Sequence, residues 1–231
     1  MSDLEYISSD EEILRSAMES SQATSWSTMP AIVESVDFAK NTISAQVAIR
    51  PKVTDENGDV FDVEIPVLVD VPICFTRGGG FSVTVPIAVG DNVLITFADR
   101  CIDAWWQNGG IQNQEVMRLH DLSDGFAVLC PSSQDKVLSG ISASSLQVRS
   151  DDGGTVIDLK KGLVTITATN IKINGNLEVT GTTKMTGDVT SGAKLTATGA
   201  FSSPTATIGG IAFASHRHSN PEGGLTGGAQ S

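Results

Sequence analysis

Residues 156–180 read VIDLKKGLVTITATNIKINGNLEVT, in which aliphatic residues alternate with threonine and other polar residues. Glycines at positions 175, 181, 187, 192 and 199 mark turns every five to seven residues. Strands this short cannot bury a core by themselves and must stack on copies of themselves. A single-chain solenoid is one solution, but the low bulk of the segments favours three chains wound together. We therefore predict an intertwined trimeric β-helix over residues 131–210.

Residues 30–130 differ in composition from this segment. All three tryptophans and six of the eight phenylalanines lie before residue 127. Short β-rich runs separated by turn residues suit the five strands of an OB-fold barrel. Asn57-Gly58 predicts a type I′ hairpin turn between two strands. The runs begin at Ala31, Thr42, Val67, Phe81 and Asn92. We predict that the chain is all-β, with an OB-fold barrel over residues 30–130.

The first residues carry a helix signal. Ser9 can cap a helix whose Glu12 stands three residues later, as in a capping box. Ile13, Leu14 and Met18 then share one face at helical spacing. We assign residues 1–29 to this short helix and a linker rich in serine and threonine.

The charge balance limits the partners. The chain has 27 acidic and 15 basic residues, a formal charge of -12, which repels phosphate backbones and argues against nucleic acid. Cys74, Cys101 and Cys130 stand in apolar runs and are expected to be small buried residues. No apolar stretch reaches the roughly 18–20 residues of a membrane span, and the start lacks the basic residues of a signal peptide. We expect the chain to fold in the cytoplasm of the cell that makes it.

His216-Arg217-His218 is the most specific motif. In a strand, alternate residues share a face, so both imidazoles point to one side. In a trimer, three copies would meet on the three-fold axis and offer six nitrogens. Zinc in proteins is nearly always tetrahedral, whereas iron or nickel accepts six imidazole ligands. We predict a structural iron ion, one per trimer, held octahedrally by His216 and His218 in an apex over residues 211–231.

Two glycine-rich or acidic motifs in the predicted barrel are interpreted as loops. Asp55-Glu-Asn-Gly-Asp59 opens like a calcium loop, but Val60 and Pro66 stand where such a loop needs glycine and glutamate. A hairpin tip is the better interpretation. Arg77-Gly-Gly-Gly80 lacks the following Lys-Ser/Thr of a phosphate loop and is interpreted as flexible.

Neither of the remaining motifs predicts catalysis. His120, Asp121 and Asp124 suggest an acid/base group, but no nucleophile motif surrounds them. We expect them to cap a strand end, and we expect no enzyme activity. Trp105 and Trp106 could stack on a sugar, although core packing or subunit contact is the commoner use of such a pair.

The chain resembles the central spike proteins of contractile-tailed bacteriophages, which are related to baseplate assembly protein V. The resemblance rests on segments that begin at Pro30, Phe97 and Arg118 and on the terminal His216-Arg-His218. It implies an OB-fold, a three-chain β-helix and an apex whose histidines hold octahedral iron. It also implies a virion protein at the tip of the tail baseplate. There it would contact the baseplate hub and tail tube and pierce the host outer membrane during contraction.

Three other classes of protein compete with this one. A receptor-binding tail fibre or adhesin is also a β-helical trimer, but residues 127–231 contain only Phe201 and Phe213 as aromatic residues. A spike of a bacterial contractile injection system has the same design and is not separated by sequence. A cell-wall-degrading enzyme would need paired carboxylates in a cleft, and Glu178 and Asp188 are interpreted as scattered surface charges.

Overall fold

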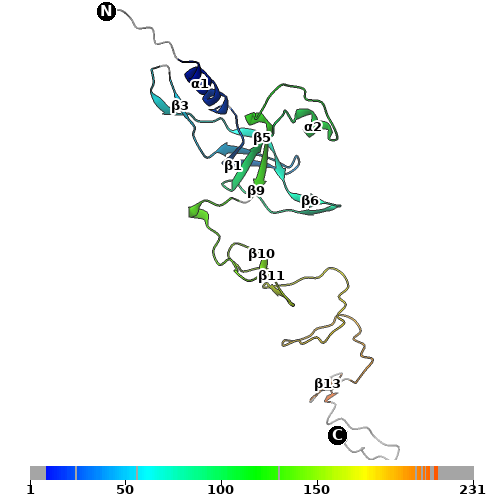
Figure 1. The fold of residues 1–231 in the computed structure, drawn as a ribbon. Coiled ribbons are helices and arrows are strands. Elements are labelled where there is room, and N and C mark those ends of the chain that lie inside the picture. Colours follow the sequence, from blue (N-terminus) through cyan, green and yellow to red (C-terminus); the bar gives the residue numbers. More distant parts are fainter. Residues whose placement is uncertain are drawn as a thin grey trace, which may run out of the picture. The chain divides into compact units, whose positions relative to one another are not determined.

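The computed structural model divides into two compact units, Met1–Asn170 and Ile171–Ser231. It describes residues 9–23, 25–55, 57–129, 131–200, 202–203, 205, 207–208 and 211–212. The first unit contains two α-helices, a barrel, two small hairpins and a small separate sheet (Figure 1). No helix in these ranges is both long and apolar enough to cross a membrane.

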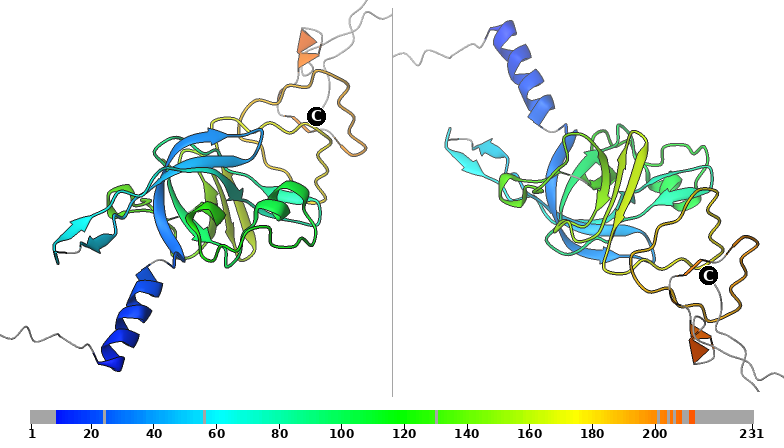
Figure 2. Two further views of the ribbon diagram at one scale, coloured as in Figure 1. Left: turned by 90° about the horizontal axis from the view of Figure 1, so that it is seen from above. Right: turned by 90° about the horizontal axis from the view of Figure 1, so that it is seen from below.

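A closed five-stranded barrel forms the core of the chain. Its strands are β1 (Thr28–Asp37), β2 (Thr42–Val47), β5 (Leu68–Cys74), β9 (Gly125–Leu129) and β8 (Asn92–Phe97), in this order around the barrel. All neighbouring pairs are antiparallel except β5 and β9, which are parallel. Figure 2 shows the barrel from two opposite sides. The predicted all-β class with an OB-like barrel is consistent with this topology.

Alternating aliphatic residues fill the barrel. Along β2, nearly every second side chain is buried, as period-two patterning requires. The largest fully buried aliphatic side chains come from three strands: Val33 from β1, Ile43 from β2, and Val93 and Ile95 from β8. Trp26 and Phe75 are partly buried and pack against this cluster.

Strand β9 replaces one of the expected barrel strands. The sequence predicts that the run from Phe81 joins the barrel, but β7 (Phe81–Val83) pairs with β6 (Thr76–Gly78) in a separate hairpin. All three residues of β7 are exposed. Gly125 opens β9 and packs so closely that an added Cβ would lie 2.8 Å from Ile95 Cγ2. The barrel wall therefore closes through a glycine-led strand with little apolar alternation.

The turns of the two small hairpins differ from the sequence prediction. Strands β3 (Lys52–Thr54) and β4 (Val60–Asp62) pair around a loop at residues 55–59. Among the described residues of this loop only Gly58 has a positive φ, so the predicted type I′ turn at Asn57-Gly58 is wrong. The two-residue turn lies at Gly79-Gly80, where both φ angles are positive as a type I′ turn requires. The segment interpreted as flexible is thus a defined hairpin.

Helix α1 (Asp10–Ala23) begins where the sequence predicts. The Glu12 N–H donates to Ser9 Oγ at 3.3 Å, which confirms the cap. Ile13, Leu14 and Met18 are 56–63% exposed, so the apolar face of the helix is uncovered.

The cysteines are not all buried as expected. Cys74 is exposed and Cys101 is half-buried, and both are free thiols, while Cys130 lies outside the described residues. Cys74 ends β5, and the strand leaves the core there. Partial burial still raises the pKa of the Cys74 thiol above its ordinary value.

A three-stranded antiparallel sheet follows the barrel in sequence. It contains β10 (Leu146–Arg149), β11 (Val156–Lys160) and β12 (Leu163–Thr167), in the order β10-β11-β12. None of its residues is buried. The only other strands in the part of the chain that the structure describes after Thr167 are β13 (Thr207–Ile208) and β14 (Ile211–Ala212).

One face of this sheet is entirely aliphatic. Residues directly opposite each other on antiparallel strands share a face. The register pairs Leu146 with Leu159, Val148 with Ile157, Ile157 with Ile166 and Leu159 with Val164. We call this the aliphatic sheet face, and its side chains are 40–69% exposed. It consists of Leu146, Val148, Ile157, Leu159, Val164 and Ile166.

Candidate functional site

The predicted iron ligands lie outside the described residues. His216 and His218 belong to the segment after Ala212, of which the structure gives no account. The tip site therefore stays a prediction from sequence. The other candidate sites lie on the barrel and are described in turn.

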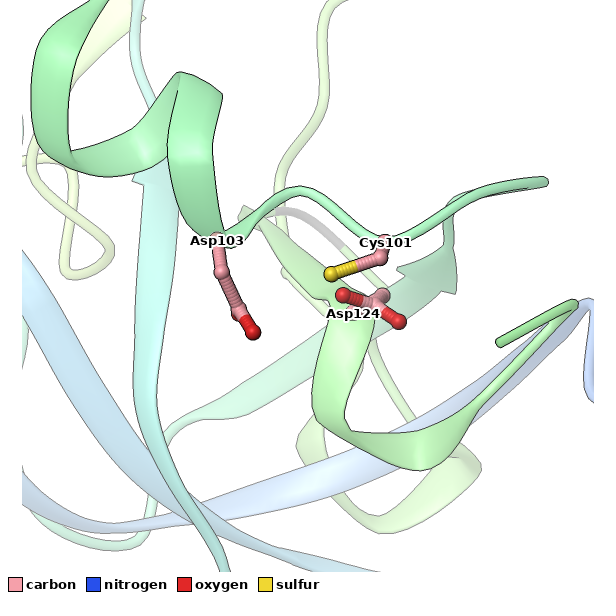
Figure 3. A group of neighbouring side chains, drawn as sticks. All are labelled: Cys101, Asp103 and Asp124. Carbon is pink, nitrogen blue, oxygen red and sulfur yellow. The ribbon is translucent and has the colours of Figure 1, made fainter. Parts of the chain in front are cut away.

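Cys101, Asp103 and Asp124 form a compact group whose ligand-type atoms lie within 4.8 Å of one another. Figure 3 shows the three side chains converging from the start of α2 (Asp103–Asn108), from the loop before it and from η1 (Leu122–Asp124). Such groups can hold a cation. Here a cationic side chain of the protein itself reaches all three residues.

Arg118 is that cation. Its Nε and Nη2 donate to both oxygens of Asp124 at 3.0 and 2.8 Å, and Nη2 also donates to Asp103 at 2.9 Å. Cys101 Sγ lies 3.1 Å from the same nitrogen. The hydrogen bonds to Asp124 hold the pKa of Arg118 above its ordinary value. The group is therefore a structural ion-pair cluster, which ties α2 and η1 together.

The suggested acid/base residues are each engaged in local structure. Asp121 caps η1 by accepting from the Ser123 N–H at 2.8 Å, and this bond lowers the pKa of the Asp121 carboxyl. His120 Nε2 lies 3.3 Å from Asp99 Oδ1, and the His120 carbonyl accepts from the Trp26 N–H. Asp124 is bound to Arg118. The three residues hold the end of the barrel, as expected for a strand-end cap.

The calcium-like motif forms the tip of the β3–β4 hairpin. Asp55 Oδ1 accepts from the backbone N–H groups of Asn57 and Asp59, each at 2.9 Å. These hydrogen bonds lower the pKa of the Asp55 carboxyl, and the bond from the Asp59 N–H has the largest effect. The carboxylate thus organises its own loop as an Asx turn.

An open groove of about 580 Å³ is the largest concave feature that we describe on the barrel. Trp105 and Trp106 of α2 form one side and are 46% and 41% exposed, so the pair does not serve core packing. The ring of Trp105 meets Phe126 edge-on, with centroids 5.8 Å apart. The β6–β7 hairpin contributes Arg77, and the turn before β2 contributes Lys40. We call this the aromatic groove, after Phe75, Trp105, Trp106 and Phe126. Lys40 and Arg77 are its charged lining residues.

The aromatic groove carries one sign of charge. Among the residues that the structure describes, its lining includes Lys40 and Arg77 and no carboxylate, although the whole chain has a formal charge of -12. Lys40 also lies 3.3 Å from Asp70 in an exposed pair. Sequence reasoning noted the tryptophans but missed the groove, because Lys40, Arg77 and Phe126 are brought beside them only by barrel closure.

The barrel matches a known protein family. Residues 29–130 match the phage protein Gp138 N-terminal domain. The Gp138 N-terminal domain match covers nearly all of the span from β1 to β9 and includes α2, the Arg118 cluster and the aromatic groove. It indicates a phage protein. No curated protein matches the chain.

Proposed function

We propose that this chain is a structural spike at the tip of a phage tail baseplate, which pierces the host outer membrane during contraction. The match of residues 29–130 to a phage protein domain supports a role in the particle. In sequence, a small barrel is followed by further short β-strands, which is the order that a spike attached through its barrel would need. Under this proposal the barrel contacts the baseplate hub and tail tube.

The observation that carries the proposal is the aliphatic sheet face. Six aliphatic side chains stand together on a sheet in which no residue is buried. A single chain gains little from such a sheet, because exposed apolar surface has not been removed from water. Three copies that turn these faces toward a common axis would form a core. This is the physical basis for proposing a homotrimer with an intertwined β-helix.

His216 and His218 are the proposed ligands of the tip ion. Three copies supply six imidazole nitrogens, a donor set that suits octahedral iron better than zinc. With every coordination position taken by protein, the ion would close the tip and would leave none for substrate. A closed, cross-linked end is what a piercing element needs.

Solution mass and metal content test the assembly and its tip. Light scattering is expected to give a trimer, and elemental analysis about one iron per trimer. A variant with His216→Ala and His218→Ala should remain trimeric and lose the metal. A monomeric protein would overturn the proposal. A trimer without metal would refute the metal-closed tip and favour a receptor-binding tail fibre.

An infection experiment with phage particles that carry the double variant would distinguish piercing from adhesion. A spike acts after attachment, so adsorption to host cells should be unchanged while genome delivery falls. If adsorption falls instead, the chain is a receptor-binding fibre or adhesin. Purified protein should also leave cell-wall substrate intact, since a muralytic activity would place it among the enzymes.

A further inference from the structure

We infer that the aromatic groove of one subunit receives helix α1 of a second copy of this chain. The inference rests on the self-association proposed above, and it identifies a contact at the barrel end of that assembly. Two uncovered surfaces of the same chain carry it: the apolar face of α1 and the groove between α2 and the β6–β7 hairpin.

Helix α1 needs a partner. It has 14 residues, and isolated helices of this length are marginal in water. Ile13, Leu14 and Met18 are 56–63% exposed within one chain. Stability for such a helix comes chiefly from packing its apolar face against something.

The helix and the aromatic groove are complementary in charge. Asp10 and Glu11 stand in the first turn, four and three residues before Leu14, and so flank the apolar face. The groove offers Lys40 and Arg77 beside its aromatic side chains, and its described lining holds no carboxylate. Leu14 and Met18 can fill the apolar part while the two acids face the two cations. A groove of about 580 Å³ has room for side chains of this size.

The connection to the barrel restricts where α1 can go within its own chain. Trp26 and Ser27 are pinned to the barrel by the bonds Trp26 N–H to His120 O and Phe97 N–H to Ser27 O. Only residues 24 and 25 lie between the end of α1 at Ala23 and this anchor. The C-terminal end of the helix is therefore held near the barrel. At about 1.5 Å per residue, Met18 and Ile13 lie about 8 and 15 Å along the helix axis from Ala23. We infer that the helix contacts the aromatic groove of a neighbouring subunit. In a symmetric assembly every subunit makes this contact, so it is repeated around the axis.

Cys74 provides a native reporter, because it is exposed and lines the aromatic groove. The variant Met18→Cys should form a disulfide to Cys74 of another subunit when it is oxidised with oxidised glutathione at alkaline pH. Denaturing, non-reducing electrophoresis would show linked chains, and peptide mapping would identify the bond between positions 18 and 74. The matched control is Glu19→Cys, which lies about 140° around the helix from Leu14 and should give little of this product.

Unmodified protein supplies a second measurement, which does not depend on the variant folding. A carbodiimide that joins carboxylates to amines should link Asp10 or Glu11 to Lys40 between chains. Arg77→Glu should lower the yield of both cross-links by about fivefold, the effect of losing one exposed ion pair and adding a repulsive one.

The outcomes distinguish this contact from the trimer itself. A trimer with cross-links only between two copies of residue 18 would mean that the helices bundle together, and the inference fails. A disulfide from position 18 to position 74 within one chain, or no specific bond in a trimer, also overturns it and leaves the spike intact. A monomer by light scattering would instead be the failure of the proposed function.

Discussion

Arg118 holds the buried carboxylate of Asp124 with two hydrogen bonds, of 3.0 and 2.8 Å. Asp124 is 1% exposed and also accepts from the Ile102 N–H. Breaking a buried pair from one side leaves a charge without a partner. Arg118→Met should therefore destabilise the barrel by about 3–5 kcal/mol.

Chemical denaturation followed by tryptophan fluorescence would measure this loss, because all three tryptophans precede residue 130. The control is Arg100→Ala, which removes an exposed pair with Asp99 and should cost at most about 1 kcal/mol. Equal effects of the two substitutions would contradict the central role of the Arg118 cluster.

Gly125→Ala should destabilise the barrel through overpacking rather than through backbone strain. The new Cβ would lie 2.8 Å from Ile95 Cγ2, and both positions belong to the closed wall. Forcing a methyl group into such a contact costs about 1–3 kcal/mol. Gly78→Ala is the matched control, since a Cβ there meets nothing within 4 Å. A thermal melt should show a lower midpoint for Gly125→Ala alone.

The acid dependence of stability should include a contribution from Asp121. The Ser123 N–H lowers the pKa of this carboxyl in the folded state. The group then stabilises the fold above its unfolded pKa of about 4, and this stability is lost as pH falls through the lower folded value. At neutral pH, Asp121→Asn should therefore have a lower melting temperature than the unsubstituted protein. The difference between the two melting temperatures should shrink in acid. A constant difference at every pH would refute the assignment.

The aliphatic sheet face should control assembly. Ile157→Asp places a charge among the other five aliphatic residues and should shift the protein from the proposed trimer toward monomer. Thr167→Asp introduces the same charge on the opposite face, because Thr167 pairs with Val156. It should leave the mass measured by light scattering unchanged. Dissociation by both variants would show that the two faces are equally involved.

Local signals are the part of the fold that the sequence predicts well. The Ser9 cap and the start of α1 follow from residues three apart, and the runs around Ala31, Thr42 and Asn92 appear as β1, β2 and β8. Turn chemistry is less certain. Asn57 has no positive φ because the Asp55 side chain organises a longer loop, whereas Gly79-Gly80 supplies the two-residue turn.

Contacts that form only when the barrel closes could not be predicted from the pattern of apolar and polar residues in the sequence. β9 begins with Gly125 and lacks strong alternation, so its place in the wall depends on space beside Ile95. Arg118 and Asp124 meet through a turn that carries no periodic signal. The aromatic groove combines positions from 40 to 126, and only their three-dimensional neighbourhood reveals a common lining.

The aliphatic sheet face has a consequence for the infected cell. The barrel closes within one chain, whereas under the proposed trimer the sheet would gain a core only when two other chains arrive. Until then the aliphatic sheet face would be open to apolar surfaces of other chains. Assembly of three copies is steeply dependent on concentration. The yield of intact particles should therefore follow the timing and amount of synthesis more closely than the stability of any single chain.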